Sequence, residues 1–576
     1  MEIASYSFAN GSLAAIKSHR LGQNWPVVYL LLNNNQKNPD LYVGETTSAV
    51  KRISQHLLNS DRKRMTEVKI VYDNQFNKSA ILDIEQTLIQ MFLADQKYVL
   101  QNKNGGQSSK HDYYQRALYQ DKVDAIWNNL HGLNITGQSA VDIRNSNLFK
   151  YSPYNTLTPE QERVSFEILN NIISCLEAGD IGTTILQGRA GTGKSILIIH
   201  MIYTLIKAAE ITYNDADLSP DEVVDLGFKI QLHTRIAEYI KKHDNLKIGF
   251  VVPMTSIRKT FKAVFKASKG AGLKASMVMG PQDVLAKECD VLFVDESHRL
   301  ARRKALTSYG SFDDSCRKLN LDPYSGTQLD MIQARCKYSV LVYDENQTVK
   351  SSDLTPEQFA GALKNRIVNE SKLTVQMRCK GGSDYIDSLD KLFDCQVSGE
   401  MDFQDYELKI FDDPNLMIQQ IRLLDKTYGL CRSVAGYSWE WISKNYSSVK
   451  EVVEAGKEDI ELCGKKYVWN MSNQEWILRT GAVNEIGCIH TTQGYDLNYV
   501  GVILGREIDY DPTNNCITIN RDLFFDKKVK SGIDDKTLMT YIVNSYKVMM
   551  TRGIKGCYIY ACNPNMQQYL KKFFGR

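Results

Sequence analysis

Two short apolar runs near the start of the chain are separated by turn-forming residues. Residues 27–32 (VVYLLL) and 41–44 (LYVG) are rich in β-branched and aromatic side chains, and the segment NNNQKNPD between them is typical of a turn. The two runs therefore predict a hairpin. Residues 49–58 and 81–93 instead place their apolar side chains at helical spacing. Together these elements predict a small α+β module.

After residue 157 the pattern changes. The apolar runs TTILQG, KIGFVVP, DVLFVDE, YSVLVYDE, VGVILG and GCYIYAC alternate with amphipathic stretches, which predicts βαβ units on mainly parallel sheets. A polar stretch rich in Gly and Asn precedes this change and is the expected linker. We therefore expect an α/β protein with a small α+β domain at residues 1–135, a linker at 136–156, and two parallel-sheet domains at 157–370 and 371–576.

The composition is that of a folded chain of several domains. Of the 576 residues, 43% are hydrophobic, and the 70 basic side chains nearly balance the 67 acidic ones. The first 150 residues hold 17 basic and 13 acidic side chains, a small excess that gives weak support to a polyanionic partner. No apolar run nears the roughly 18 residues of a membrane helix, and none of the 12 Cys belongs to a C-x-x-C pair. With no secretory pattern at the start, we expect a cytoplasmic protein with reduced thiols and no membrane contact.

The run GRAGTGKS fits the phosphate-loop pattern G-x-x-x-x-G-K-[ST] and lies between a predicted strand and a predicted helix. Gly188, Gly191 and Gly193 would let backbone N–H groups turn toward a phosphate, and the start of the helix adds positive potential. Lys194 would neutralise the β- and γ-phosphates of a nucleotide, and Ser195 would ligate Mg²⁺. This pattern predicts ATP and Mg²⁺ as cofactors.

Two later strands lead to polar side chains that suit the same site. The run VLFV ends at Asp295 and Glu296. Asp295 would hold Mg²⁺ through the coordination shell of the ion, and Glu296 would orient or deprotonate the attacking water. Carboxylates at the end of a buried strand need a compensating cation, which supports this interpretation. The strand at residues 338–343 (YSVLVY) leads to Gln347, whose amide is a candidate sensor of the γ-phosphate.

Further motifs follow toward the end of the chain. They are LTPEQ ending at Gln161, PMT at residues 253–255, QMR ending at Arg378, HTTQG ending at Gln493 and Gly494, and TRG around Arg552. In kind and order this set resembles a superfamily-one helicase motor over residues 155–576. The QMR, HTTQG and TRG forms most resemble the bacterial Schlafen-like helicase family, whose function is otherwise uncharacterised.

The resemblance implies two RecA-like domains with ATP between them. Gln161 would read the adenine base, and Gln493 and Gly494 would lie at the nucleotide and nucleic-acid edge of the second domain. Arg378 and Arg552 would reach the γ-phosphate from that domain when the cleft closes, and closure would couple hydrolysis to movement along a strand.

The front module carries side chains suited to phosphodiester cleavage. Tyr29 and Tyr42 lie on the predicted hairpin, Arg52 and His56 lie four apart on one helix face, and Glu85 lies on the later helix. This set, with VVY and YVG in place of the name motifs, resembles a GIY-YIG nuclease domain. By that resemblance Glu85 is the only protein ligand of a divalent metal, and Arg52 clamps the phosphate. Tyr29 is the general base, and Tyr42 and His56 position groups or relay protons.

Three features have more than one interpretation. The family's late Asn is either Asn102 or Asn104. The Trp and Tyr residues at 437–446 and 467–476 either pack in a core, which we favour, or stack on bases. An apolar helical face after residue 255 is accompanied by basic side chains, and this helix is either a solvated surface or an edge that follows the phosphates of a single strand. The basic residues are Arg258, Lys259, Lys262, Lys266, Lys269 and Lys274.

The sequence as a whole predicts a GIY-YIG endonuclease carried by an ATP-driven superfamily-one translocase. Its expected partner is nucleic acid, with DNA favoured over RNA, and no protein partner is indicated. Such fusions resemble bacterial restriction and phage-defence enzymes, with repair or recombination as the next alternative. The competing interpretation is a nucleic-acid-gated ATPase switch whose front module binds DNA without cutting it. A plain phosphate-loop kinase would leave Arg378, Gln493 and Arg552 unexplained.

Overall fold

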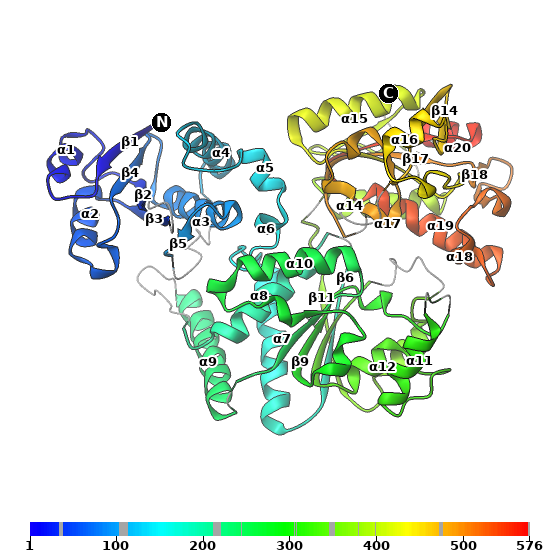
Figure 1. Ribbon diagram of the computed structural model, residues 1–576, viewed down its shortest axis with the longest axis horizontal. Coiled ribbons are helices and arrows are strands. Elements are labelled where there is room, and N and C mark those ends of the chain that lie inside the picture. The colour runs from blue at the N-terminus through cyan, green and yellow to red at the C-terminus, as the bar shows by residue number, and fades with distance from the viewer. Residues whose placement is uncertain are drawn as a thin grey trace. The chain divides into compact units, whose positions relative to one another are not determined.

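The front part of the chain folds around an antiparallel sheet, and the rest folds around two parallel sheets (Figure 1). Two compact units divide the chain: Met1–Leu157 with Ala263–Ala275, and Thr158–Lys262 with Ser276–Arg576. The computed structural model describes residues 1–33, 39–102, 113–189, 191–210, 220–243, 245–304, 306, 308–344, 352–377, 379–397, 399–471, 476–492 and 494–573. The expected α/β fold class is confirmed.

A five-stranded sheet with the order β1-β4-β2-β3-β5 forms the centre of the front unit. Its strands are β1 (Glu2–Ser7), β2 (Val27–Asn33), β3 (Asp40–Thr46), β4 (Glu67–Tyr72) and β5 (Val99–Leu100). Neighbouring strands are antiparallel except that β5 runs parallel to β3. The predicted hairpin is confirmed as β2 and β3, in which Tyr29 lies opposite Gly44.

Helices cover both faces of this sheet, which explains why β2 is apolar without interruption from Val27 to Leu32. Successive side chains of a strand point to opposite faces. Leu30 therefore packs in a core with α3 and α4, whereas Leu31 packs in a core with α1 and α2. Figure 1 shows these two pairs of helices on opposite sides of the sheet. The helices are α1 (Ser12–Ser18), α2 (Ala49–Leu58), α3 (Lys78–Asp95) and α4 (Arg116–Gly132). Both predicted helices of the module, α2 and α3, are confirmed.

Residues 136–156, expected to be a linker, contain two short helices, α5 (Ala140–Asn145) and α6 (Asn147–Lys150). Ala140 and Ile143 are buried in the same core as α3 and α4, and Phe149 packs against that core. This segment is therefore part of the front unit's fold, which corrects the expectation of a spacer.

The second unit contains a six-stranded sheet with the order β11-β6-β10-β9-β7-β8, in which all neighbours are parallel. Its strands are β6 (Gly182–Gly188), β7 (Ile248–Val251), β8 (Val278–Met279), β9 (Cys289–Val294), β10 (Cys336–Tyr343) and β11 (Ile367–Leu373). The carboxyl ends of parallel strands share one edge, where open α/β sheets bind their ligands. The residues that follow β6, β9 and β10 therefore meet at this edge.

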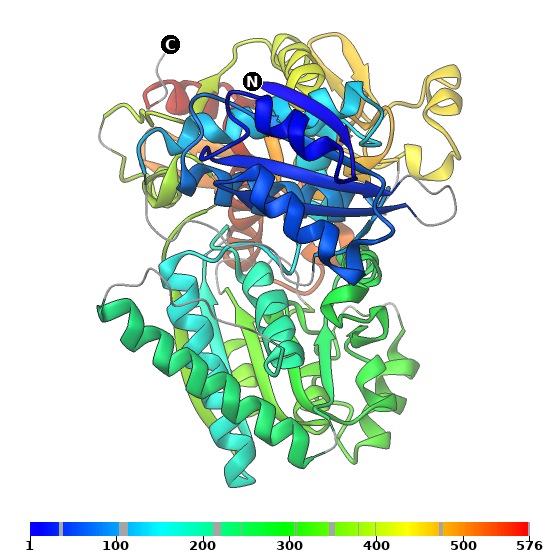
Figure 2. The same ribbon diagram turned by 90° about the vertical axis from the view of Figure 1, so that its left-hand side faces the viewer.

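Helices connect the strands of this sheet as βαβ units require. They are α7 (Pro159–Ala178), α8 (Lys194–Lys207), α9 (Pro220–Lys242), α10 (Thr255–Ala267), α11 (Tyr309–Lys318), α12 (Gln328–Gln333) and α13 (Pro356–Gly361). Helices α7 and α9 lie side by side, and α7 packs on β6, β10 and β11 (Figures 1 and 2). Among the described residues, no helix is both long and apolar enough to cross a membrane.

A second parallel sheet, ordered β12-β20-β17-β13-β16, forms the centre of the C-terminal part. Its strands are β12 (Glu407–Ile410), β13 (Arg432–Ala435), β16 (Ile486–Gly487), β17 (Leu497–Leu504) and β20 (Gly553–Ala561). Two hairpins lie apart from it, β14 (Ile460–Leu462) with β15 (Lys465–Tyr467), and β18 (Ile508–Asp511) with β19 (Cys516–Ile519).

Helices also accompany this second sheet. They are α14 (Gly382–Phe393), α15 (Pro414–Tyr428), α16 (Val449–Glu454), α17 (Ile489–Thr492), α18 (Lys527–Lys530), α19 (Asp535–Met550) and α20 (Pro564–Lys571). Trp439 and Trp469 are buried in its core, and Trp476 is 1% exposed. Core packing is therefore the correct interpretation for these tryptophans.

Candidate functional sites

Tyr29 on β2 is the centre of a polar cluster in the front unit. Its hydroxyl oxygen lies 2.7 Å from His56 Nε2 and accepts the Nε–H of Arg52 at 3.3 Å. Arg52 and His56 lie one turn apart on α2, which lets both reach Tyr29. The ring centroid of Tyr42, on β3, lies 6.2 Å from that of Tyr29 and 5.3 Å from that of His56. The fold thus brings these four predicted residues together.

Gly44 makes room for the Tyr29 hydroxyl. A β-carbon on Gly44 would lie 2.3 Å from both Cζ and Oη of Tyr29, closer than real Cβ contacts allow. The neighbouring Val43 is held by Asn102, whose side-chain amide accepts Val43 N–H at 3.1 Å and donates to Val43 O at 2.9 Å. Asn102 therefore fixes the strand that carries Gly44. Asn104, the alternative late Asn, lies outside the described residues.

Burial sets the protonation of this cluster. It raises the pKa of Tyr29 well above the usual value, an effect that Tyr42 increases and Arg52 opposes. Burial also lowers the pKa of His56 to about 4, with smaller contributions from Arg52 and Arg62. His56 is therefore neutral at pH 7. Because the Arg52 Nε–H is a permanent donor to Tyr29 Oη, the phenol proton is available for donation to His56 Nε2.

Glu85 on α3 is a largely buried carboxyl group. Burial and, second, the charge of Glu45 raise its pKa to about 7, against the opposing effects of Lys78 and Arg52. Glu45 is itself paired with Lys78 at 2.6 Å. A carboxylate whose charge is poorly compensated suits a divalent cation, which would supply the missing positive charge. The described ranges contain no group of three or more His, Cys, Asp or Glu that could hold a metal.

The phosphate loop connects β6 with α8, as the sequence predicts. Gly191 and Gly193 have φ angles of 88° and 79°, in the left-handed region that favours glycine. Lys194 is buried, and its ammonium group donates to two loop carbonyls, one of them Arg189 O at 2.8 Å. The same Nζ lies 3.8 Å from Asp344 Oδ2, at the end of β10. The lysine ammonium group is therefore held within the phosphate loop by the loop's own carbonyl groups.

Ser195 and the carboxylates after β9 meet at the same edge of the sheet. The Ser195 hydroxyl donates to Asp295 Oδ2 at 2.8 Å. Burial, and next the charge of Glu296, raises the pKa of Asp295. Burial opposes ionisation of Glu296 too, but His298 and Arg299 lower its pKa, and His298 Nε2 lies 3.0 Å from Glu296 Oε2. Glu296 is therefore ionised at neutral pH, beside a carboxyl group that holds its proton more strongly than usual.

The segment 374–377, which leads into the QMR motif, lies against the phosphate loop. Two of its N–H groups donate to the Glu160 carboxylate at 3.0 Å, and the N–H of Met377 donates to Gly191 O at 2.9 Å. A β-carbon on Gly191 would lie 2.0 Å from Gln376 Oε1, so this side chain rests on the loop. Three predicted site residues lie outside the described part of the chain: Gln347, Arg378 and Gln493.

Three other predicted motor residues are closely surrounded by their neighbours. Gln161 is 1% exposed, completes the N-terminal capping box of α7, and donates to Thr192 O at 3.1 Å. It therefore ties α7 to the phosphate loop. Gly494 lies against α10, since a β-carbon there would lie 2.7 Å from Ile257. Arg552 follows α19 and is 2% exposed.

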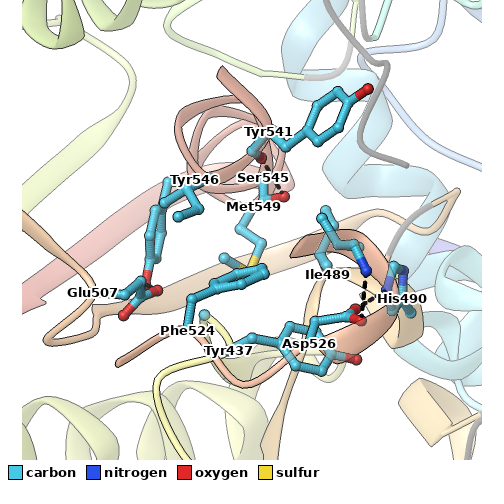
Figure 3. A pocket seen from close by; sticks show the side chains of 13 residues that line it. Tyr437, Ile489, His490, Glu507, Phe524, Asp526, Tyr541, Ser545, Tyr546 and Met549 are labelled. Carbon is cyan, nitrogen blue, oxygen red and sulfur yellow. Dashed lines mark hydrogen bonds and ion pairs between the residues drawn. The ribbon is translucent and has the colours of Figure 1, made fainter. Parts of the chain in front are cut away.

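A cavity of about 20 Å³ lies between α17 and α19, beside the HTTQG motif (Figure 3). In it, His490 lies 3.7 Å from Asp526, and the Tyr546 hydroxyl donates to Glu507 at 2.5 Å. Burial raises the pKa of Glu507. The volume suits about one water molecule. The sequence analysis did not identify this cavity. It is too small for a nucleotide, and two of the residues that line it, Ile489 and His490, lie on α17.

Comparison with known families agrees with both sites. A family model described as "Schlafen group 3, DNA/RNA helicase domain" matches residues 182–563, and the GIY-YIG catalytic domain matches residues 26–99. The first match covers more than half of the chain, so the protein belongs to the Schlafen group 3 helicase family. It also carries a GIY-YIG catalytic domain. The two resemblances expected from the motifs are confirmed.

Individual relatives have low sequence identity to this chain. An uncharacterized protein of Saccharomyces cerevisiae is 26% identical over 457 residues, which are 72% of this chain and 90% of the relative. The structure of the arterivirus helicase, nonstructural protein 10, with DNA has 13% identity and a TM-score of 0.27, and the match covers 70% of this chain and 65% of that one. The Pif1 helicase of Candida albicans has 11% identity and a TM-score of 0.25, over 73% of this chain and 98% of that one.

Proposed function

We propose that the protein is an ATP-driven nucleic-acid translocase that carries a metal-dependent endonuclease. The observation that carries this proposal is the contact of Tyr29 Oη with both His56 Nε2 and Arg52 Nε. A buried phenol between a neutral imidazole and a guanidinium is suited to accept a proton from water and pass its own proton on. The family matches at both ends of the chain support the combination of a nuclease with a helicase-like ATPase.

In the nuclease, Tyr29 would take a proton from the attacking water as its own proton moves to His56 Nε2. Such a transfer avoids a free phenolate, which burial makes unfavourable. Arg52, which already contacts Tyr29, would also bind the phosphate. Tyr42 would position the neighbouring groups. Mg²⁺ bound to Glu85 would stabilise the charge that develops on the phosphate. Glu85 can hold that cation only after it loses its proton, since its pKa is about 7.

In the motor, Lys194 and the loop glycines would bind the phosphates of ATP. Ser195 and Asp295, already in contact at 2.8 Å, would hold Mg²⁺, and ionised Glu296 would orient and deprotonate the attacking water. Further roles follow from the family resemblance. Adenine recognition is assigned to Gln161, γ-phosphate sensing to Gln347, charge stabilisation to Arg378 and Arg552, and contact at the nucleotide edge to Gln493 and Gly494.

Helix α10 supports nucleic acid as the partner. Its apolar face is buried at Ile257 and Phe261, whereas Lys262 and Lys266 are exposed. Exposed lysines on one packed helix can follow a phosphate backbone. DNA is the favoured substrate, and restriction of invading phage DNA is the proposed biological role. Plating of phages on cells that express the wild-type protein or Glu85→Ala tests this role, since protection that survives the substitution excludes DNA cutting as its cause.

The biochemical proposal is tested with supercoiled plasmid, Mg²⁺ and ATP. Glu85→Ala should abolish nicking and leave ATP turnover intact, whereas Lys194→Ala should abolish ATP turnover. The exposed Lys63, in the front unit, provides a matched charge control as Lys63→Ala. ATP turnover with no cleavage of any DNA or RNA would refute the nuclease and leave a nucleic-acid-gated ATPase switch. Nicking that persists in Glu85→Ala would refute the metal assignment.

A further inference from the structure

Arg62, a residue that the sequence analysis did not single out, lies beside the nuclease cluster. It ends the 3₁₀ turn Ser60–Arg62 that follows α2, and Asn59 caps this turn by accepting Asp61 N–H at 2.9 Å. The turn brings the Arg62 guanidinium over Tyr42, with Cζ 4.0 Å from the ring centroid. The charge is close enough to His56 to contribute to its lowered pKa. A second guanidinium therefore faces the cluster, in addition to Arg52.

The side-chain donors of Arg62 have no acceptor among the described residues. Its Nε is buried without a hydrogen-bond partner, and its side chain forms no hydrogen bond or ion pair with any residue that the structure describes. Nearby Arg64 differs, because its Nε lies 2.9 Å from Asp40. A guanidinium that stacks on a ring through its face still presents its N–H groups in the plane of the group. A partly buried cation with unused donors is costly unless an anion satisfies it.

We infer that Arg62 is a second phosphate-binding residue of the nuclease centre. This inference rests on the proposed nuclease function and assigns a contact to its nucleic-acid substrate. Arg52 donates to Tyr29, so we assign Arg52 to the phosphate that is attacked. Arg62 lies over the Tyr42 ring and would hold a neighbouring backbone phosphate. The planar fork of an arginine suits bidentate contact with phosphate oxygens.

The alternative is that Arg62 only supports the Tyr42 ring. The two roles predict different changes in Arg62→Ala. Removal of a phosphate-binding group weakens substrate binding and raises KM, whereas a displaced Tyr42 lowers kcat. Salt dependence also separates the two roles. For duplex DNA, a protein that binds one phosphate fewer has a slope of log binding constant against log salt that is less negative by about 0.9.

The experiment uses the full-length protein and plasmid DNA. Binding of Arg62→Ala is measured over a salt series in a Glu85→Gln background, which does not cut, and nicking is measured with Glu85 intact. We expect about ten- to hundredfold weaker binding, the reduced salt slope, and a raised KM. Arg62→Lys should keep the salt slope but bind more weakly than wild type. The control Arg64→Ala removes the same charge two residues away and should keep the wild-type salt slope.

An Arg62→Ala protein with the salt slope and KM of Arg64→Ala overturns the inference, as does a fall in kcat with unchanged binding. Arg62→Gln, which keeps most of the side chain, replaces Arg62→Ala if the latter lowers the unfolding temperature. The binding series decides the role of Arg62 even if the wild-type protein cuts no nucleic acid. In that event the proposed nuclease fails, and the salt slope still reports whether Arg62 binds phosphate.

Discussion

Gly44→Ala provides a sharp test of the nuclease centre, because it adds one methyl group at the position opposite Tyr29. The new Cβ would lie 2.3 Å from Tyr29 Oη, whereas ordinary contact begins at 3.4 Å, so the hydroxyl must move by about 1.1 Å. Tyr29 is fully buried and its hydroxyl holds His56 at 2.7 Å. A shift of this size breaks the alignment of the phenol with both of its partners.

The expected loss follows from this displacement. Misplacement of a reacting group by about 1 Å costs on the order of a hundredfold in rate, which corresponds to about 2.7 kcal/mol of activation free energy. Overpacking of a core by one methyl group costs about 1–3 kcal/mol of stability. That is less than the roughly 5–15 kcal/mol that keep a typical domain folded. We therefore expect a folded protein that nicks DNA about a hundredfold more slowly.

The assay is single-turnover nicking of plasmid, with ATP hydrolysis and thermal unfolding measured on the same sample. Gly11→Ala is the matched control, because a β-carbon at Gly11 meets no atom within 4 Å and its φ of −60° suits alanine. ATP hydrolysis should be unchanged in both variants. If Gly44→Ala nicks as fast as Gly11→Ala while it remains folded, the hydroxyl of Tyr29 is not at the reaction centre.

Two further predictions concern Glu85 and α5. Since the pKa of Glu85 is raised to about 7, its proton must leave before a cation binds. The Mg²⁺ concentration for half-maximal nicking should therefore rise about tenfold per pH unit below 7 and level off above it. A requirement that does not vary from pH 5 to pH 9 would contradict the assignment. Ile143→Ala removes a fully buried side chain of α5 and should lower the free energy of unfolding of the front unit by about 2–5 kcal/mol in urea. An unchanged unfolding curve would mean that α5 is not part of the core.

Much of the fold is encoded locally. The run VVYLLL predicts a strand because β2 is covered on both faces, and an unbroken apolar run is what such burial requires. The phosphate loop is recognisable because strand, glycines and helix are contiguous in the chain. Ser195 and Asp295 are a hundred residues apart, but their contact is predictable from the parallel sheet that joins β6 and β9 through β10.

The predicted linker was wrong for a physical reason. Ser139 and Ser146, which contribute to its polar composition, are helix caps that accept Asp142 N–H and Phe149 N–H at 3.2 Å. Capping residues are polar because they satisfy the first free N–H groups of a helix. In helices as short as α5 and α6, the caps are a large share of the residues, and composition alone then resembles a loop.

Arg62 could not be found from the sequence for a different reason. It lies in the charged run DRKR, where its neighbours include exposed Lys63 and ion-paired Arg64. Nothing in the spacing distinguishes these side chains, because only the turn after α2 and the position of β3 bring Arg62 over Tyr42. Gln161 illustrates the same point. The family motif implies adenine contact, and the T-x-x-Q spacing from Thr158 is that of a capping box, but the bond to Thr192 O comes from the fold alone.

The chain leaves the front unit along the helix that carries Glu85. Gln86 and Gln90 of α3 donate to Tyr154 O at 3.4 and 2.7 Å, and the Thr156 hydroxyl donates to Gln86 at 3.0 Å. Thr158 then caps α7, so a single residue separates Thr156, the last residue hydrogen-bonded to α3, from the N-cap of α7. Two peptide bonds join Thr156, which is hydrogen-bonded to the helix that carries Glu85, to Thr158, the first residue of the next unit.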